Sequence, residues 1–170
     1  MSPTVHGKGP MAPFHVDSEV GPLRRVLLHR PGPELRRITP TNRHELLFDD
    51  VPWVQRAREE HDAFAAVLAD RGVEVLLVGD LLTETMNDPR ARTWLFDRVV
   101  HERDLGRDLA EATREALEGA APATVTTHLI AGTMVDELPH GSTRGLRADV
   151  LGPKGFVLSP LPNQLFTRDA

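Results

Sequence analysis

Apolar residues recur along the first half of the chain with two different periods. A short apolar run at residues 26–28 ends at Pro31-Gly32, and a second run at residues 73–78 is short and β-branched. Both runs predict buried strands. Between them the apolar positions lie three or four residues apart, which predicts one face of a helix: Val51, Val54, Ala57, His61, Phe64, Val67 and Leu68. A strand, a helix and a strand within about 55 residues predict a βαβ-like unit with a parallel strand pair.

Both ends of this predicted helix carry recognisable signals. Asp49 and Asp50 precede it and suit the positive end of the helix dipole, and Pro52 suits the first turn. Gly72 is well placed as a C-cap. The preceding segment, ITPTNRHELLFDD at residues 38–50, predicts a polar loop with one apolar knot.

After residue 80 the composition shifts towards Glu, Arg, Ala and Leu, which predicts several helices. Pro89 fits the start of a helix, and Thr133 fits the cap of a short helix that Pro139 stops. ATVTTHLIAG is ambiguous, because its Thr and Val content weakens a helix. HGSTRGLRADVLGPKG predicts a loop, FVLSPLPN a strand, and LFTRD the start of another. The apolar positions of the two predicted longer helices are Trp94, Leu95, Phe96, Val99 and Val100 in the first, and Leu105, Leu109 and Leu117 in the second, which ends near Gly119.

These elements predict an α/β fold in which the chain leaves a first module and returns to it. The module covers residues 17–79 and 150–170, and a helical domain is inserted at residues 80–149. The Pro- and Gly-rich residues 1–16 predict a flexible tail without the apolar core of a secretory signal. Because no apolar run approaches about 18 residues, no membrane span is expected.

Composition excludes several kinds of chemistry. The net charge of the 170-residue chain is −5 and no long basic run exists, so a nucleic-acid partner is not expected. The chain has no cysteine, which excludes a disulfide, a thiolate metal site and a thiol nucleophile within it. Its eight histidines are scattered and form no recognised metal motif, so no metal site is predicted. His61 is expected to be half-buried and His101 solvated, whereas His128 suits either place. Arg24-Arg25 and Arg36-Arg37 are expected to be solvated pairs.

The segment PNQLFTRD allows two interpretations. In one it is an Asn turn followed by an edge strand, with Arg168 and Asp169 in solvent. In the other, Asn163 and Asp169 face a polar ligand and Phe166 supplies a flat apolar wall. An aspartate beside an aromatic ring suits a guanidinium or ammonium group, because the carboxylate accepts two parallel N–H bonds while the ring stacks.

Three colinear stretches resemble bacterial arginine deiminases: SEVGPLRRVLLHRPGPELRRITPTN, then ELLFDDVPWVQRAREEHDAFAAVLADRGVEVLLVGDLLTET, then LPNQLFTRD. The resemblance implies the fold of the guanidine-modifying superfamily, a five-bladed α/β propeller of ββαβ modules with an inserted α-helical domain, of which this chain would hold the first part. It also implies site roles. Asp169 would pair with the substrate guanidinium, Phe166 would line its pocket, Asn163 would hold the amino-acid end, and Leu47 would pack on the substrate from a mobile loop. Arg168 would be structural, and Asp49 and Asp50 keep their expected capping role.

The implied reaction converts L-arginine and water to L-citrulline and ammonia, in the cytoplasm and without a cofactor. In the family a cysteine attacks the guanidinium carbon to give a covalent amidino intermediate, and a histidine acts as acid and base. This chain has no cysteine, and none of its histidines stands in the matching motif. The sequence therefore predicts an N-terminal fragment that is inactive alone. The alternatives are a non-catalytic binding protein derived from the family, or a hydrolase of another guanidine such as dimethylarginine or agmatine. A homo-oligomer is left open.

Overall fold

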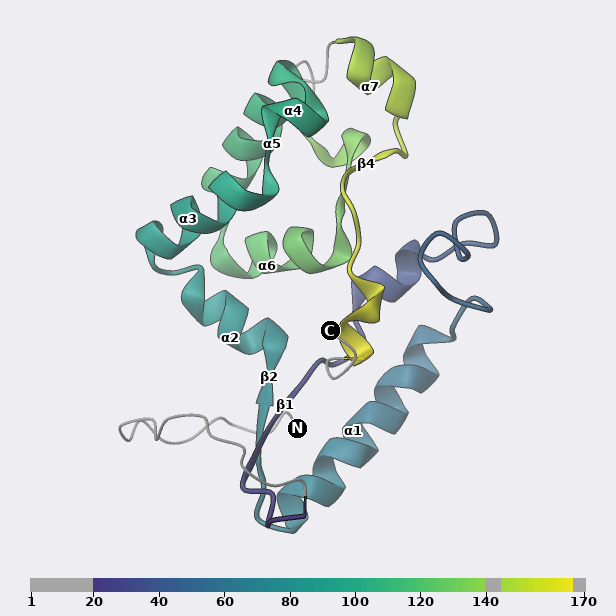
Figure 1. The fold of residues 1–170 in the computed structure, drawn as a ribbon, viewed down its shortest axis with the longest axis vertical. Helices are drawn as coiled ribbons and strands as arrows, with labels where there is room; N and C mark the ends of the chain where they lie inside the picture. Colours follow the sequence, from purple (N-terminus) through teal and green to yellow (C-terminus); the bar gives the residue numbers. More distant parts are fainter. Residues whose placement is uncertain (1–19, 140–144, 167–170) are drawn as a thin grey trace.

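Two short parallel strands and the helix between them form the first part of the fold. The computed structural model describes residues 20–139 and 145–166 (Figure 1). Strand β1 (Arg25–Leu28) pairs in parallel with β2 (Glu74–Leu77), with Leu27 opposite Leu76, and α1 (Val54–Asp70) connects them. The predicted βαβ unit is thus confirmed.

The two ends of α1 differ in how well the sequence predicted them. Gly72 has a φ of 78°, and the Val73 N–H closes the helix by donating to the Leu68 carbonyl at 3.1 Å, so the predicted glycine stop is confirmed. The predicted start is wrong. The helix begins at Val54 with Trp53 as its N-cap, and no acidic residue lies in its first turn. Asp49 and Asp50 instead belong to the preceding loop.

Helix α1 presents a narrower buried face than its apolar pattern predicts. Val54, Ala57, His61 and Leu68 are half-buried. Phe64 and Val67, which were predicted on the same face, are 54% and 47% exposed. A single layer of two strands covers only one stripe of the helix, so apolar residues beside that stripe remain in contact with solvent.

A run of helices follows directly from β2. Phe96, Leu109, Leu117 and Val125 lie at the centre of the apolar core that these helices build. Trp94 was predicted on the buried face but is 56% exposed, with the Arg98 guanidinium 3.7 Å above its ring. The helices are α2 (Val78–Thr85), α3 (Pro89–Val99), α4 (Glu102–Leu105), α5 (Arg107–Glu118) and α6 (Pro122–Ala131).

The chain then returns through a second small sheet. Several predictions for this part of the sequence are wrong. Thr133 does not cap a helix, because it lies in β3 (Thr133–Met134), which pairs antiparallel with β4 (Phe156–Leu158). Part of the predicted loop forms α7 (Leu146–Leu151), and the predicted final strand begins instead as the 3-10 helix η3 (Pro162–Phe166). A further 3-10 helix, η2 (Val135–Glu137), follows β3.

The described residues therefore form a mixed α/β fold that is rich in helices and has two two-stranded sheets. None of their helices has the length and apolar content needed to cross a membrane.

A buried carboxylate fixes the turn after β1. The 3-10 helix η1 (Pro33–Arg37) carries Glu34, which is 0% exposed. Its Oε1 lies 3.0 Å from Nε2 of His29 and accepts the Gly32 N–H. A Cβ on Gly32 would approach Glu34 Oε2 to 2.5 Å, so a larger residue there would force the Glu34 carboxylate to move. Leu35 and Ile38 are also buried, so η1 is held in the interior at both its start and its end.

Helix α1 is attached to the same turn by its polar side chains. Arg30 donates two hydrogen bonds of 2.7 Å to Asp62, and Arg58 Nε donates to the Pro31 carbonyl at 2.7 Å. His61 lies beside them, half-buried as predicted. Burial lowers the pKa of His61 from 6.5, and the Asp62 carboxylate, which favours the charged ring, does not offset it.

The lowered pKa of His61 predicts a loss of stability in mild acid. Its stabilising contribution is complete above pH 6.5 and is lost as the pH falls through the folded-state pKa, because the unfolded chain then binds the extra proton. We expect the urea midpoint of the wild-type chain to fall more between pH 7.5 and 5.5 than that of His61→Gln. His101→Gln, at an exposed position, is the control and should retain the wild-type fall. Parallel curves for wild type and His61→Gln would contradict this assignment.

Candidate functional site

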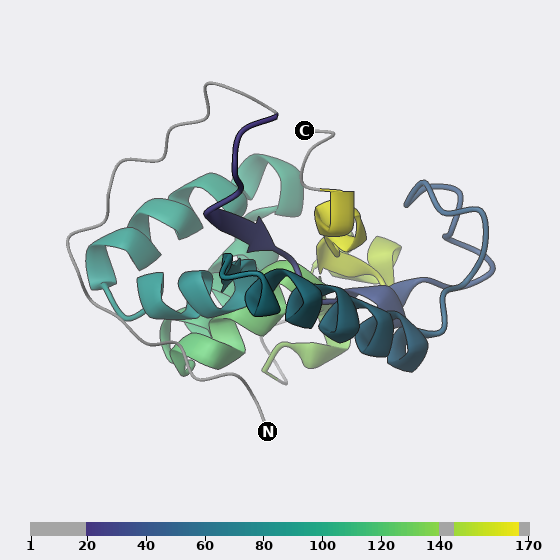
Figure 2. The ribbon, with the colours of Figure 1, turned by 90° about the horizontal axis from the view of Figure 1, so that it is seen from below.

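The segment from Thr39 to Asp50 is a loop that is closed on itself. Four backbone N–H groups donate to backbone carbonyls within it, and the shortest of these four bonds runs from Phe48 to the Arg43 carbonyl at 2.8 Å. The Arg43 guanidinium donates to the Asp49 carbonyl and lies 3.6 Å from the Asp50 carboxylate. These contacts replace the capping role predicted for the two aspartates. Figures 1 and 2 both show this loop projecting from the side of the molecule away from α3.

Leu47, in this loop, has an unusual backbone conformation. Its φ is 62°, a left-handed value that costs a residue with a Cβ about 1 kcal/mol or more. Its side chain is 81% exposed, so no burial of the leucine offsets that cost. A strained, exposed apolar side chain is a frequent feature of ligand-binding loops.

Asn163 contacts the loop at Leu46, the residue next to Leu47. Nδ2 of Asn163 donates to the Leu46 carbonyl at 3.3 Å, across 117 positions of sequence. Asn163 lies on η3, which is attached to the C-terminal end of α6 because the Leu161 N–H donates to the Ile130 carbonyl at 2.9 Å. Phe166 is the last residue of η3, and Asp169 and Arg168 lie outside the described residues.

The described part of this site offers binding chemistry rather than bond-breaking chemistry. Asn163 supplies an amide that donates and accepts, and Leu47 supplies an apolar surface. Over residues 20–139 and 145–166, no three His, Asp or Glu side chains are grouped to hold a metal ion. The site is thus suited to a small molecule that has both polar and apolar parts.

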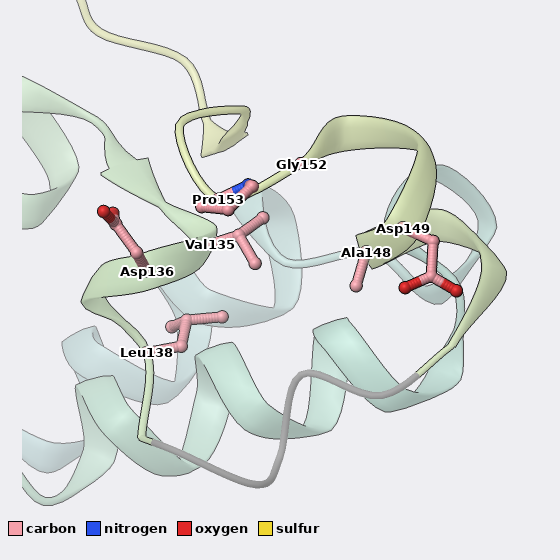
Figure 3. Close-up of a pocket in the computed structure, with 7 residues that line it drawn as sticks. All are labelled: Val135, Asp136, Leu138, Ala148, Asp149, Gly152 and Pro153. Atoms are coloured by element: carbon pink, nitrogen blue, oxygen red, sulfur yellow. The ribbon is translucent and has the colours of Figure 1, made fainter.

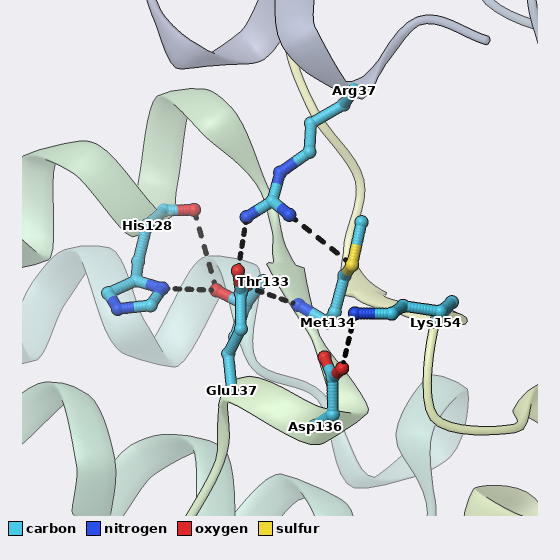
Figure 4. A network of polar contacts seen from close by, with 7 residues as sticks. All are labelled: Arg37, His128, Thr133, Met134, Asp136, Glu137 and Lys154. Atoms are coloured by element: carbon cyan, nitrogen blue, oxygen red, sulfur yellow. Dashed lines mark hydrogen bonds and ion pairs between the residues drawn. The ribbon is translucent and has the colours of Figure 1, made fainter.

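A polar network joins η1 to β3 and η2, and the sequence did not predict it (Figure 4). Arg37, which was predicted to be solvated, donates to Glu137 at 2.5 Å and to Met134 Sδ at 3.3 Å. Burial raises the pKa of Glu137, but the Met134 N–H and Arg37 outweigh it, so the pKa is lowered overall. The Arg37 carbonyl also accepts from the Asn42 side chain at 2.9 Å, inside the loop. Arg25 likewise pairs with Glu74 rather than standing free in solvent.

Two hollows in the surface of the described residues lie away from Leu47 and Asn163. One of about 390 Å³ is lined by Val135, Leu138 and Ala148, with the carboxylates of Asp136 and Asp149 at its edges (Figure 3). Asp136 points away from the hollow and is paired with Lys154 at 2.6 Å. Without polar groups that converge on its interior, this hollow has little capacity to orient a ligand.

Comparison with known proteins matches the family model described as arginine deiminase to residues 44–170. The chain belongs to the arginine deiminase family. The match includes Leu46, Leu47 and Asn163, so the hydrogen bond between Asn163 and Leu46 lies inside the matched region.

Curated relatives named arginine deiminase agree with this membership. The protein from Rhodococcus jostii (strain RHA1) is 51% identical over 161 residues, which is 94% of this chain and 40% of the relative. Those from Rhodococcus opacus (strain B4) and Mycolicibacterium gilvum (strain PYR-GCK) are 50% and 49% identical over the same shares. The chain therefore spans about two fifths of the length of these relatives.

The left-handed conformation of Leu47 predicts that glycine is preferred over alanine there. Both substitutions remove the exposed side chain, but only Leu47→Gly relieves the strain. We expect the free energy of unfolding of Leu47→Gly to exceed that of Leu47→Ala by about 1 kcal/mol. This figure already includes the loss that arises because glycine makes the unfolded chain more flexible. Ala66→Gly, in the middle of α1, should instead destabilise the protein by about 1 kcal/mol. Urea denaturation measures both effects, and a Leu47→Ala chain as stable as Leu47→Gly would refute the strain.

Proposed function

We propose that this chain forms the first, substrate-binding part of an arginine deiminase, which hydrolyses L-arginine to L-citrulline and ammonia. The observation that carries the proposal is the contact between Asn163 and the Leu47 loop. It joins two segments far apart in the sequence, and each contains a residue that the family resemblance assigns to the substrate. In this proposal Asn163 meets the amino-acid end, Leu47 covers the aliphatic part, and Phe166 and Asp169 hold the guanidinium.

The chemistry of the ligand supports this division of roles. Arginine carries a charged amino-acid group at one end, three methylene groups, and a planar guanidinium at the other. A carboxylate such as Asp169 matches the guanidinium with two parallel hydrogen bonds, which fix its orientation for attack. The guanidinium carbon is a poor electrophile, so we propose that a cysteine supplied by the remaining part of the family's enzyme attacks it. A C–N bond then breaks to release ammonia, and water cleaves the S–C bond of the covalent intermediate to give citrulline and the free thiol.

The proposal includes the architecture. Residues 17–79 and 150–170 would be the first module of a five-bladed α/β propeller, residues 80–149 its inserted helical domain, and residues 1–16 a tail. Leu23, which precedes β1, is 53% exposed, and Leu27, in β1, is 44% exposed. Further modules of such a propeller would cover apolar side chains that are exposed at the edge of this small sheet.

The isolated chain should be inactive, because it contains no thiol. We expect no citrulline from L-arginine with the purified 170 residues in a colorimetric assay in which the intact Rhodococcus jostii protein is run beside it. Turnover above the buffer control would refute the assigned mechanism.

A chimaera tests the substrate-binding role directly. In it, this chain replaces the matching 40% of the Rhodococcus jostii protein. We expect the chimaera to form citrulline, and Asp169→Asn to lower its kcat/KM by about a hundredfold or more, because the guanidinium loses its charged partner. A folded chimaera whose activity is unaffected by Asp169→Asn would contradict the proposed role.

A further inference from the structure

The side chain of Asn163 is only partly engaged in this structure. Its amide has two N–H donors and one carbonyl acceptor. One N–H donates to the Leu46 carbonyl at 3.3 Å. Because that partner is a carbonyl oxygen, the contacting atom must be the amide nitrogen, which fixes the orientation of the whole group. The second N–H and Oδ1 make no hydrogen bond to any described residue, and the residue is exposed.

The segment that carries Asn163 is anchored to the rest of the fold by more contacts than the loop that carries Leu46. Pro162, next to Asn163, is buried, and the adjoining Leu161 is bonded to α6. The loop, in contrast, is held mainly by its own backbone hydrogen bonds and by the Asn42 side chain, which bonds to the Arg37 carbonyl. Leu46 thus connects a strained, exposed loop to a fixed point on η3.

We infer that Asn163 couples the capture of the amino-acid end of the ligand to the position of the Leu47 loop. The inference rests on the proposed function and adds the coupling to it. One N–H of Asn163 holds the loop, while the other N–H suits a carboxylate and Oδ1 suits an ammonium group. A free α-amino acid carries both groups on one carbon, so the unused atoms of this amide match it better than they match an amine alone.

The coupling works in both directions. The bond to Leu46 restricts rotation of the Asn163 amide, so the amide is oriented before the ligand arrives. A ligand that fixes the same amide in turn strengthens the bond to Leu46 and holds Leu47 in place. Coupling free energies are reciprocal, so a ligand that senses the loop must also stabilise it.

Amide hydrogen exchange in the loop measures this coupling. The reporters are the backbone N–H groups of Leu46, Leu47 and Phe48, each of which is hydrogen-bonded inside the loop. We expect Asn163→Ala and Asn163→Asp to speed hydrogen exchange of these three amides about two- to fivefold, because each substitution removes one exposed hydrogen bond to the loop. Asp is nearly isosteric but its carboxylate has no N–H to donate. Asn87→Ala, which removes another exposed Asn bonded to backbone carbonyls, should leave the loop unchanged.

Ligands complete the experiment. L-Arginine should slow exchange at these three amides in the wild-type chain but not in Asn163→Ala. Agmatine, which keeps the guanidinium and lacks the carboxylate, should not slow it. Unchanged exchange in Asn163→Ala, or equal slowing by arginine with and without Asn163, would overturn the inference. If Asn163→Ala loosens the loop while arginine alters no amide in the wild-type chain, the proposed arginine binding fails and the coupling fails with it.

Discussion

The buried carboxylate of Glu34 is the constraint on which the arrangement of this chain depends. A carboxylate withdrawn from water is costly unless its oxygens are hydrogen-bonded. Here Oε1 faces His29 and accepts the Gly32 N–H, whereas Oε2 is buried with no hydrogen-bond partner among the described residues. Removing Glu34 would leave His29 buried without this partner. The pair therefore fixes the direction in which the chain leaves β1 and places η1 against α6.

The candidate site follows from the position of η1. On one side, Arg37 reaches Glu137 and so attaches η1 to the segment that follows α6. On the other side, Asn42 holds the beginning of the loop to the Arg37 carbonyl. The loop then places Leu47 near η3, which α6 holds independently. Residues of two distant segments meet because both are anchored to one group of helices.

Local periodicity predicted the elements that are determined by neighbouring residues. The parallel pair β1 and β2, α1 with its glycine stop, and the start of α3 at Pro89 all depend on patterns a few residues long. Burial was predicted less well. Phe64 and Trp94 have the right spacing for a core face, but the neighbouring layers are too narrow to cover them.

Local sequence patterns could not predict contacts between residues that lie far apart in the sequence. Arg37 beside Arg36 has the appearance of a solvated pair, and only the fold shows that one of the two meets a glutamate 100 residues away. Asp49 and Asp50 suit a helix start until the helix is found to begin at Val54. The association of Leu47 with Asn163 came from the family resemblance, because no local signal connects two residues so far apart.

We propose that Asn163 and the Leu47 loop form one binding site for an amino acid with a guanidinium end. Titration of the ¹⁵N-labelled chain with L-arginine tests this most directly, with the side-chain amide of Asn163 and the backbone amides of residues 46–48 as reporters. We expect these signals to shift together, along one saturation curve. Shifts confined to other parts of the chain, such as the hollow around Val135 and Ala148, would contradict it.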